Sequence, residues 1–430
     1  MNESGERKPE MLRATQQKIA VVGSGISGLI AASLLDKHHD VTIFEAGDYF
    51  GGHTNTVEIQ TEGKTIAVDT GFIVFNDVTY PNFLKFLTKY NVASQPTTMS
   101  FSFHDEATGF EYNGTTLNTL FAQRSNLISV KFYKMLSEII RFNREGKAFA
   151  ANGNETILLG DYLRERKYSQ ELIEWYVIPM GAAIWSSKHD QMKEFPAKYF
   201  LQFFNHHQML NVNERPVWRT ISGGSREYVR AMMSQFSGKA HTKSPVERIE
   251  RTVAGIRLTV TGAQPMEFDQ IVIAAHSDQA LRMLADPSQS ETEILGAIPY
   301  QKNMAYLHSD IRVLPSRRKA WAAWNSRLLK DSNRTALSYQ MNLLQNLPLR
   351  ETQLIVTLNE KSAIDETKML QEIEYHHPVY TLESVAAQRR KAEISGVNRT
   401  HYCGAYWHFG FHEDGAKSAL EVGSHFGVAL

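Results

Sequence analysis

The sequence predicts an α/β fold in which two domains are interleaved along the chain. Three observations predict it. A β-branched run at Lys18–Val22 is followed by a glycine-spaced turn, a helical pattern and a second strand at Val41–Phe44. From Tyr80 to Arg219 apolar residues recur at helical spacing. The strand patterns "IRLTV" and "DQIVIAA" return only after this helical segment. One domain is therefore expected to be assembled from separate stretches of the chain.

Composition excludes several classes of protein. The chain has 430 residues, 42% hydrophobic and 21% charged, with a formal net charge of +0. A protein whose main partner is nucleic acid needs a surplus of basic residues, so that class is excluded. The single cysteine, Cys403, rules out an internal disulfide and favours a reducing, cytoplasmic location. No apolar run is long enough to span a membrane, and the polar residues 1–17 are expected to form a disordered leader.

The first turn has the spacing G-x-G-x-x-G. Gly23 allows the tight turn, Gly25 lets the backbone approach a pyrophosphate at a helix N-terminus, and Gly28 lets helix and strand pack closely. Glu45, 22 residues after Gly23, follows the second strand and can accept hydrogen bonds from a ribose. Its charge would repel a 2′-phosphate, which disfavours NADP. This context predicts a Rossmann-type dinucleotide site, with Ile26, Ser27 and Ala46 as further contacts.

The stretch "EAGDYFGGHTN" indicates which dinucleotide is the cofactor. Here the chain resembles the flavin-dependent amine oxidase superfamily, which includes monoamine oxidases, protoporphyrinogen oxidases and phytoene desaturases. In that superfamily an acid, a short spacer and a Gly-Gly-Arg turn support the pyrophosphate of FAD. The corresponding residues are Gly51 and Gly52, followed by His53 where arginine is usual, and by Thr54. The resemblance implies FAD. Cys403 is the only possible thioether donor, and its place between a strand and a loop predicts that the FAD is bound without a covalent link.

Further matches extend the resemblance from residue 18 to residue 423. "AVDTGFIVF" resembles the segment under the flavin ring, "WRTISGGSREYV" resembles the turn that returns the chain to the FAD domain, and "SPVERIE" resembles the strand that contacts adenine. The tail "HYCGAYWHFGFHEDGAKSALEVG" resembles the C-terminal motif around the ribityl chain and ring. The residues implied by these matches are Gly71, Phe72, Ile73, Val246, Gly404, Gly410, Phe411, His412, Glu413 and Ala416.

The resemblance therefore implies a Rossmann-type FAD-binding domain interleaved with a mixed α+β substrate domain, as in amine oxidases. We assign residues 18–79, 220–286 and 395–430 to the FAD domain, and residues 80–219 and 287–394 to a substrate domain with a helical insertion. "IPMGAAIWS", "HPVYTLESVAAQRRK" and "GFHEDG" resemble a bacterial branch known only as predicted NAD/FAD-binding proteins. Relatives in that branch accompany fatty-acyl methyltransferases, and similar flavoproteins dehydrogenate methyl-branched acyl chains.

These resemblances imply an FAD oxidoreductase that takes a hydride from an apolar substrate, with a methyl-branched fatty acyl chain as the first expectation. An FAD amine oxidase and an FAD-binding accessory subunit of a lipid-modifying system remain as alternatives. Loss of hydride from an acyl chain needs a partner for the adjacent proton. His308, Tyr339 and His412 are the candidates, and the sequence does not rank them. The cluster His408, His412, Glu413 and Asp414 lacks metal-ligand spacing, and the last helix is expected to begin only at about Gly415, so no metal is expected.

Two helical patterns have two interpretations each. One set of apolar residues could line a substrate tunnel, although a simple core is the commoner role of such residues. It consists of Met180, Ile184, Trp185, Phe200, Phe203 and Phe204. A second set of basic residues could touch an anionic membrane, although a solvated helix face is the commoner role. It consists of Arg124, Lys131, Lys134, Arg141 and Arg144. The oligomeric state is not indicated by the sequence.

Overall fold

The computed structural model describes residues 16–211, 216–330 and 335–430. Nearly all of the expected disordered leader lies outside the described residues. Its last residue, Gln17, accepts a hydrogen bond from the backbone N–H of Asp40.

The first domain is built on a five-stranded sheet in which every neighbouring pair is parallel. Its strands, in spatial order, are β10 (Lys239–His241), β2 (Asp40–Phe44), β1 (Lys18–Val22), β14 (Gln270–Ile273) and β20 (Thr400–Tyr402). Because the strands are parallel, their carboxyl ends lie at one edge. Gly23, Glu45, His276 and Gly404 all follow strands that end there.

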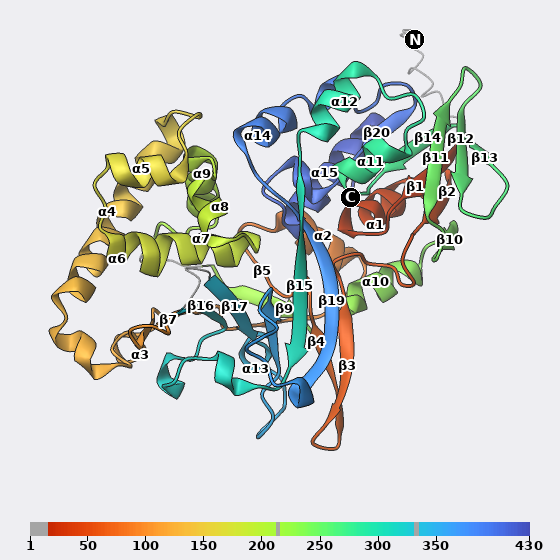
Figure 1. The fold of residues 1–430 in the computed structure, drawn as a ribbon. Helices are drawn as coiled ribbons and strands as arrows, with labels where there is room; N and C mark the ends of the chain where they lie inside the picture. Colours follow the sequence, from red (N-terminus) through yellow and green to blue (C-terminus); the bar gives the residue numbers. More distant parts are fainter. Residues whose placement is uncertain (1–15, 212–215, 331–334) are drawn as a thin grey trace, which may run out of the picture.

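Helices from distant parts of the chain cover this sheet. α1 (Ile26–Leu35) and α15 (His412–His425) lie side by side, and all ten residues of α1 are buried. Figure 1 shows α15 beside α1. The other helices of this part are α10 (Arg226–Met233), α11 (Ser277–Met283), α12 (Gln289–Gly296) and α14 (Leu382–Gln388). A small antiparallel sheet completes it, with β11 (Val246–Arg251), β12 (Ile256–Val260) and β13 (Met266–Phe268).

The second domain is built on a seven-stranded mixed sheet. Its spatial order is β19 (Met369–Pro378), β15 (Tyr300–His308), β18 (Ile355–Leu358), β17 (Thr335–Gln340), β16 (Trp324–Leu328), β7 (Phe101–Asp105) and β8 (Phe110–Asn113). The hairpin of β3 (Thr56–Thr61) and β4 (Lys64–Asp69) packs on this sheet through Ile66 and Val68. A short sheet of β5 (Phe75–Asn76), β9 (Trp218–Ile221) and β6 (Ser94–Pro96), and the helix α13 (Met341–Leu344), complete this part.

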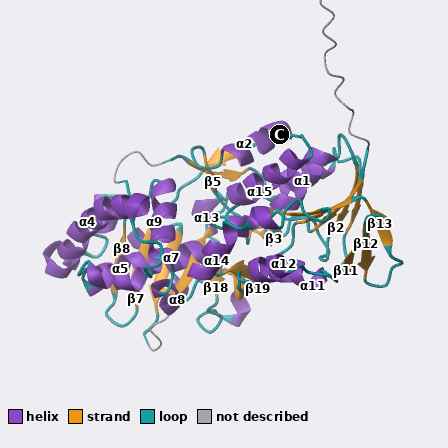
Figure 2. Ribbon diagram, turned by 90° about the horizontal axis from the view of Figure 1, so that it is seen from above, coloured by secondary structure: helices purple, strands orange, loops and turns teal. Residues whose placement is uncertain are grey.

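A helical insertion extends from the second domain, as the periodicity predicts. It comprises α3 (Leu117–Leu120), α4 (Val130–Asn152), α5 (Leu159–Glu165), α6 (Gln170–Leu172), α7 (Ile178–Trp185), α8 (His189–Lys193) and α9 (Ala197–His206). Figure 2 shows α4 and α5 at the end of the molecule opposite β12 and β13. No helix among the described residues has the length and apolar character needed to cross a membrane.

The α/β fold with two interleaved parts agrees with the prediction. The domain boundaries themselves stay a prediction. Three helices that the sequence assigns to the substrate domain pack with the first domain instead. α12 and α14 contribute Ile294, Leu295 and Ala387 to the core around β14. α2 (Pro81–Lys89) packs on α15 and contributes Phe83 and Phe86 to the core around α1.

Candidate functional site

The turn after β1 is held by close backbone contacts. Gly23 has φ +97°, and its N–H donates to the carbonyl of Phe44 at 2.8 Å. A Cβ on Gly28 would lie 2.0 Å from the carbonyl oxygen of Gly23, so only glycine permits this approach of helix to strand. Both glycines therefore have the roles that the spacing predicts.

Gly25 is different, because a Cβ placed on it would meet no atom within 4 Å. It is the N-cap residue of α1 and has an ordinary extended conformation, φ −62° and ψ 175°. The next helical residues, Ile26 and Ser27, are buried. The space beside Gly25 adjoins the N-terminus of α1, where unpaired N–H groups and the helix dipole favour an anion.

The Glu45 carboxylate is directed back at this turn. One oxygen accepts hydrogen bonds from the N–H of Ser24 at 2.9 Å and from its hydroxyl, and the other accepts from the N–H of Gly47 at 2.8 Å. Ser24 was not among the predicted contacts. Ala46, which follows, is exposed, and the carbonyl of Glu45 accepts from Ser244, two residues before Val246 at the start of β11. Glu45, Ala46 and the approach to Val246 are thus brought together.

The second glycine pair faces the first turn. Gly51 and Gly52 have φ +132° and +59°, and a Cβ on Gly52 would lie 3.1 Å from Cα of Gly25. The N–H of Gly51 donates to the Ser24 hydroxyl at 3.2 Å. Thr54, buried, shares hydrogen bonds with Tyr228 and with Nε2 of His412, the latter at 3.1 Å. The two glycine turns and the N-terminus of α15 therefore meet at one place.

A cluster of histidines lies beside the second turn. The ring of His53 stacks on Tyr375 with centroids 5.0 Å apart, and lies 5.1 Å from His377 and 6.2 Å from His276. Burial lowers the pKa of His53 to about 4 and that of His276 to about 3, and holds the pKa of His377 well below its usual value. The three rings are therefore neutral near pH 7. Nε2 of His53 is buried and has no hydrogen-bond partner within the described ranges.

Sequence reasoning missed this cluster. The ring of His377 lies 5.1 Å from His53, and the ring of its neighbour His376 lies 6.5 Å from His276. The side chain of His376 is 44% exposed. The signal that could have found the cluster is the position of His276 and His53, each just after a strand or turn at the carboxyl edge of the parallel sheet.

The segment after β4 packs on the second turn. The N–H of Phe72 donates to the carbonyl of His53 at 2.8 Å, and a Cβ on Gly71 would lie 2.1 Å from that same oxygen. The ring of Phe72 stacks on His412 with centroids 3.4 Å apart. Ile73, buried, faces the seven-stranded sheet instead.

The tail returns to the first turn, as predicted. A Cβ on Gly415 would lie 2.7 Å from the side chain of Ile26 and 2.8 Å from that of Ser27, so α15 crosses α1 in contact with it. Ala416 is fully buried in the same core. Gly404 donates its N–H to Ser418 at 3.1 Å. Gly410 has φ +98° and lies against Tyr380.

The charged residues of the tail are engaged as caps. Glu413 accepts from the N–H groups of Asn82 and Phe83 at the start of α2, at 2.9–3.1 Å. Asp414 accepts from the N–H of Phe411 at 2.9 Å, so α15 begins at His412 and not near Gly415, where the sequence pattern places it. Burial raises the pKa of Glu413 and raises that of Asp414 to about 6.

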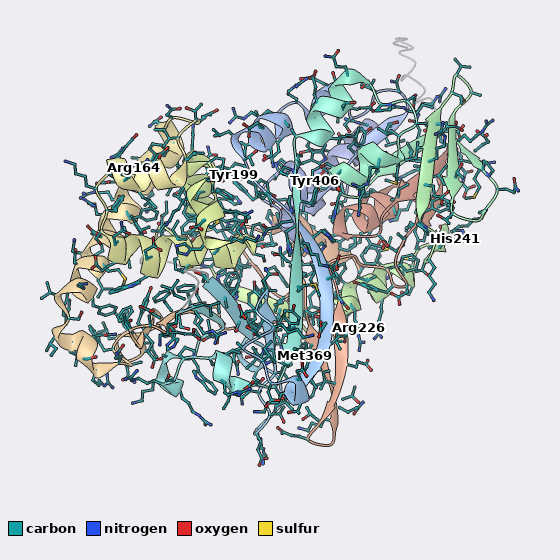
Figure 3. The ribbon with its side chains drawn as sticks, in the orientation of Figure 1. Arg164, Tyr199, Arg226, His241, Met369 and Tyr406 are labelled. Atoms are coloured by element: carbon teal, nitrogen blue, oxygen red, sulfur yellow. The ribbon has the colours of Figure 1, made fainter. Side chains whose placement is uncertain are left out.

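Aromatic rings join the tail to the helical insertion. We call Tyr199, Phe203, Phe409 and Phe411 the aromatic bridge. The centroids of Tyr199 and Phe409 are 4.7 Å apart, those of Phe203 and Phe411 4.8 Å. Figure 3 labels Tyr199 on α9 and Tyr406 in the tail, and the amide of Gln388 lies 3.1 Å from the Tyr199 hydroxyl and 2.7 Å from the Tyr406 carbonyl.

The expected tunnel residues are divided between two roles. Phe200 and Phe204 stack on each other with centroids 4.2 Å apart and are fully buried, as core residues are. Trp185, at the end of α7, donates from its indole N–H to the carbonyl of Phe409 at 3.1 Å. Met180 is buried and Ile184 half-buried on the same helix.

The three candidate proton partners do not lie together. His412 is buried beside Phe72, Thr54 and Tyr228, and burial holds its pKa well below the usual value. The hydroxyl of Tyr339, on β17, points toward the carbonyl of Ala183 in α7 at 3.5 Å, and burial raises its pKa. His308 is the last residue of β15, bonded to Thr357 at 2.8 Å. It lies roughly 26 Å along that strand from Tyr300, which stacks on His276.

No group of three or more His, Cys, Asp or Glu side chains that could hold a metal ion is found in the part of the chain that the structure describes. The clustered histidines face one another with stacked or tilted rings. The site is thus two glycine-lined turns, one carboxylate and one helix N-terminus, with neutral imidazoles beside them.

This arrangement defines a dinucleotide-binding protein of the two-domain flavin type, and comparison with known proteins agrees. The model of the family of flavin containing amine oxidoreductases matches residues 26–308. The chain belongs to this family, and FAD is its cofactor, as the sequence predicts.

The relatives are distant. An L-amino-acid oxidase of Siganus canaliculatus is 23% identical over 328 residues, which cover 67% of this chain and 56% of the relative. A probable flavin-containing monooxygenase 1 of Arabidopsis thaliana is 35% identical over 82 residues, 17% of this chain and 15% of the relative. The chain thus spans little more than half of the first relative and much less of the second.

Solved structures show the same fold over nearly all of the chain. A CLA-producing fatty acid isomerase from P. acnes superposes with a TM-score of 0.69 at 15% identity, covering 97% of this chain and 100% of that one. A cyclohexylamine oxidase from Brevibacterium oxydans superposes with a TM-score of 0.68 at 15% identity, covering 96% and 100%. These likenesses confirm the predicted two-domain fold.

The residues present fit FAD. The space beside Gly25 admits a phosphate at a helix N-terminus, and the Glu45 carboxylate lies where a ribose diol can donate to it. His53, whose buried Nε2 has no partner in the described ranges, follows Gly52, and a Cβ on Gly52 would lie 3.1 Å from Cα of Gly25.

Proposed function

We propose that the protein is an oxidoreductase that removes a hydride from a C–H bond of an apolar substrate, and that this substrate is a fatty acyl chain, methyl-branched in the first instance. FAD would be held by the predicted contacts at both glycine turns, by Glu45, and by the tail from Gly404 to Ala416. The observation that carries the proposal is the aromatic bridge. It lines the junction between the tail and the helical insertion with rings, and such surface favours apolar ligands.

The carboxylates of the tail already accept hydrogen bonds within the protein, which also supports an apolar substrate. An ammonium group entering a low-dielectric site is stabilised by a carboxylate that is free to pair with it. Glu413 is occupied by the start of α2, and Asp414 by the N–H of Phe411. The fatty acid isomerase of the same fold is a further support, limited to the fold by its 15% identity.

Bound FAD would supply the hydride acceptor and pass the electrons to oxygen or to a carrier. The chain must exclude water and accept the proton from the adjacent carbon. His412 suits this second task by protonation state, because its ring is neutral at pH 7. Tyr339 keeps its proton at that pH and suits the role of a donor that orients the substrate.

The test is anaerobic bleaching of the flavin bands of the purified holoprotein. Vesicles of methyl-branched phospholipid, vesicles of straight-chain phospholipid and a panel of amines are compared at equal concentration. Bleaching by the acyl chains supports the proposal. Bleaching by amines alone makes the protein an amine oxidase, and bleaching by neither favours the accessory subunit.

Two variants sharpen this test. Phe409→Leu should raise the concentration for half-maximal bleaching about two- to tenfold, since an aromatic contact contributes about 0.5–1.5 kcal/mol beyond its area. Phe110→Leu is the matched control, a buried ring that packs on Trp175 at 4.2 Å in the core of the insertion. Equal effects of the two variants would show that the aromatic bridge does not bind the substrate.

His412→Gln tests the proton acceptor. The amide can still bond Thr54 and Tyr228 but cannot take up a proton. Bleaching, measured per bound FAD, should slow at least about 100-fold, the lower range for general base catalysis. An unchanged bleaching rate in a variant that retains FAD would make His412 a packing residue.

A further inference from the structure

Exposed apolar side chains gather on one edge of the helical insertion. Of the fourteen exposed large hydrophobic residues in the described part of the chain, six lie within residues 117–140. We call these six the insertion rim: Leu117, Leu127, Ile128, Val130, Tyr133 and Ile140. Ile128 is 87% exposed and Val130 83%. Single exposed apolar side chains are normal on a protein surface, whereas a group of them marks an interaction site.

The rim is held in a fixed shape. Ser129 caps α4 by accepting from the N–H of Phe132, and the Tyr133 hydroxyl donates to the carbonyl of Leu127 at 3.1 Å. Phe132 and Met135, on the opposite side of the helix, are fully buried. The apolar corner at Ile128 is therefore presented on an ordered scaffold.

The charges around the rim are of one sign. The exposed charged residues from position 117 to position 147 are all basic: Arg124, Lys131, Lys134, Arg144 and Lys147. The two acids of α4 are engaged inward, since Glu138 accepts from Ser169 at 3.0 Å and Glu145 from Tyr168 at 2.8 Å. Lys131 lies 3.5 Å from Glu171, whereas Lys134 and Arg144 have no ion-pair partner in the described ranges.

The geometry points to an anionic phospholipid surface as the partner of the insertion rim. Apolar side chains flanked by unpaired cations are the pattern of an interfacial helix, in which apolar area and attraction to anionic lipid act together. A second copy of the chain fits less well, because a symmetric contact at this rim would bring like charges together. α4 runs along the outer edge of the molecule, orange at the left of Figure 1 and at one end in Figure 2, so a flat surface can reach it.

The test uses the full chain with vesicles of phosphatidylcholine, with and without about 30% phosphatidylglycerol, in a flotation assay. Binding should require the anionic lipid and should weaken as salt rises from 0.05 to 0.5 M, because screening shortens the reach of the charges. This inference stands apart from the proposed substrate, since the vesicles contain no methyl-branched chain and no turnover is measured.

Variants locate the surface. Ile128→Ser with Val130→Ser should lower the partition coefficient at least about tenfold, and Lys134→Glu with Arg144→Glu should lower it by about fivefold or more for each cation removed. The controls are Val253→Ser, fully exposed between β11 and β12, and Lys239→Glu on β10, both at the other end of the molecule. The melting temperature of each variant checks that it folds.

Three results would overturn the inference. They are an absence of binding to anionic vesicles, an equal loss of binding in the two control variants, and a dimer in solution that Ile128→Ser with Val130→Ser converts to a monomer. The last result would assign the rim to a second copy of the chain.

Discussion

A methyl group on Gly25 should abolish tight FAD binding without harming the fold. A Cβ at this position meets no atom within 4 Å, and the backbone angles, φ −62° and ψ 175°, are ordinary for alanine. Alanine at an N-cap costs up to about 1 kcal/mol relative to a better capping residue, so Gly25→Ala should remain folded. The methyl group would instead fill the space beside the helix N-terminus.

The loss of affinity can be estimated. If the methyl group displaces the phosphate from one charge-assisted hydrogen bond, the cost is about 1.5–3 kcal/mol, or about 10- to 150-fold in Kd. FAD affinity is measured by quenching of flavin fluorescence on titration of the apoprotein. Stability is measured as the melting temperature of that apoprotein.

Gly28→Ala is the contrasting variant. Its Cβ would lie 2.0 Å from the carbonyl oxygen of Gly23, so the helix or the strand must move. Overpacking of this kind costs about 1–3 kcal/mol, and the melting temperature should fall. Wild-type FAD affinity in Gly25→Ala, or equal loss of stability in both variants, would refute the assignment of the space beside Gly25 to the cofactor.

Three further predictions follow from the site. Glu45→Gln should weaken FAD binding about tenfold or more by titration, because it removes the charge that accepts from Ser24 and Gly47; unchanged affinity would place the ribose elsewhere. The apoprotein should lose stability as pH falls from about 6.5 toward 4. Burial lowers the pKa of His53 in the folded chain to about 4, so the unfolded chain takes up the proton at a higher pH. This group alone lowers the free energy of unfolding by up to about 3 kcal/mol. His53→Gln should flatten that decline in melting temperature, and a decline as steep as the wild type's would contradict the neutral ring. Cys403 has no exposed surface and a pKa raised to about 12, so it should not react with a disulfide reagent at pH 8 until guanidinium is added. Mass spectrometry of the denatured protein should give the mass of the chain alone, and a mass that includes FAD would contradict the non-covalent cofactor.

The parts of the site that the sequence predicts are those encoded locally. Gly23, Gly25 and Gly28 lie within six residues, and their spacing follows from one turn joining a strand to a helix. Glu45 follows from the next strand. The approach of the tail was predicted by resemblance, and the contact of Gly415 with Ile26 agrees with it.

The histidine cluster could not be predicted in the same way. His53, His276 and His377 come from three separate segments, and only the assembled sheets bring them together. The start of α15 was misplaced for a different reason. Asp414 caps the N–H of Phe411 and allows the helix to begin at His412, which periodicity alone does not reveal.

The contact of α15 with α1 has a consequence for biosynthesis. All ten residues of α1 are buried, and they are covered partly by a helix made almost four hundred residues later. During translation α1 stays uncovered until α15 has been synthesised, so its apolar surface is exposed and the nascent chain can aggregate. A premature stop before codon 412 should thus yield insoluble product instead of a weakened enzyme, because no shorter chain can shield that surface.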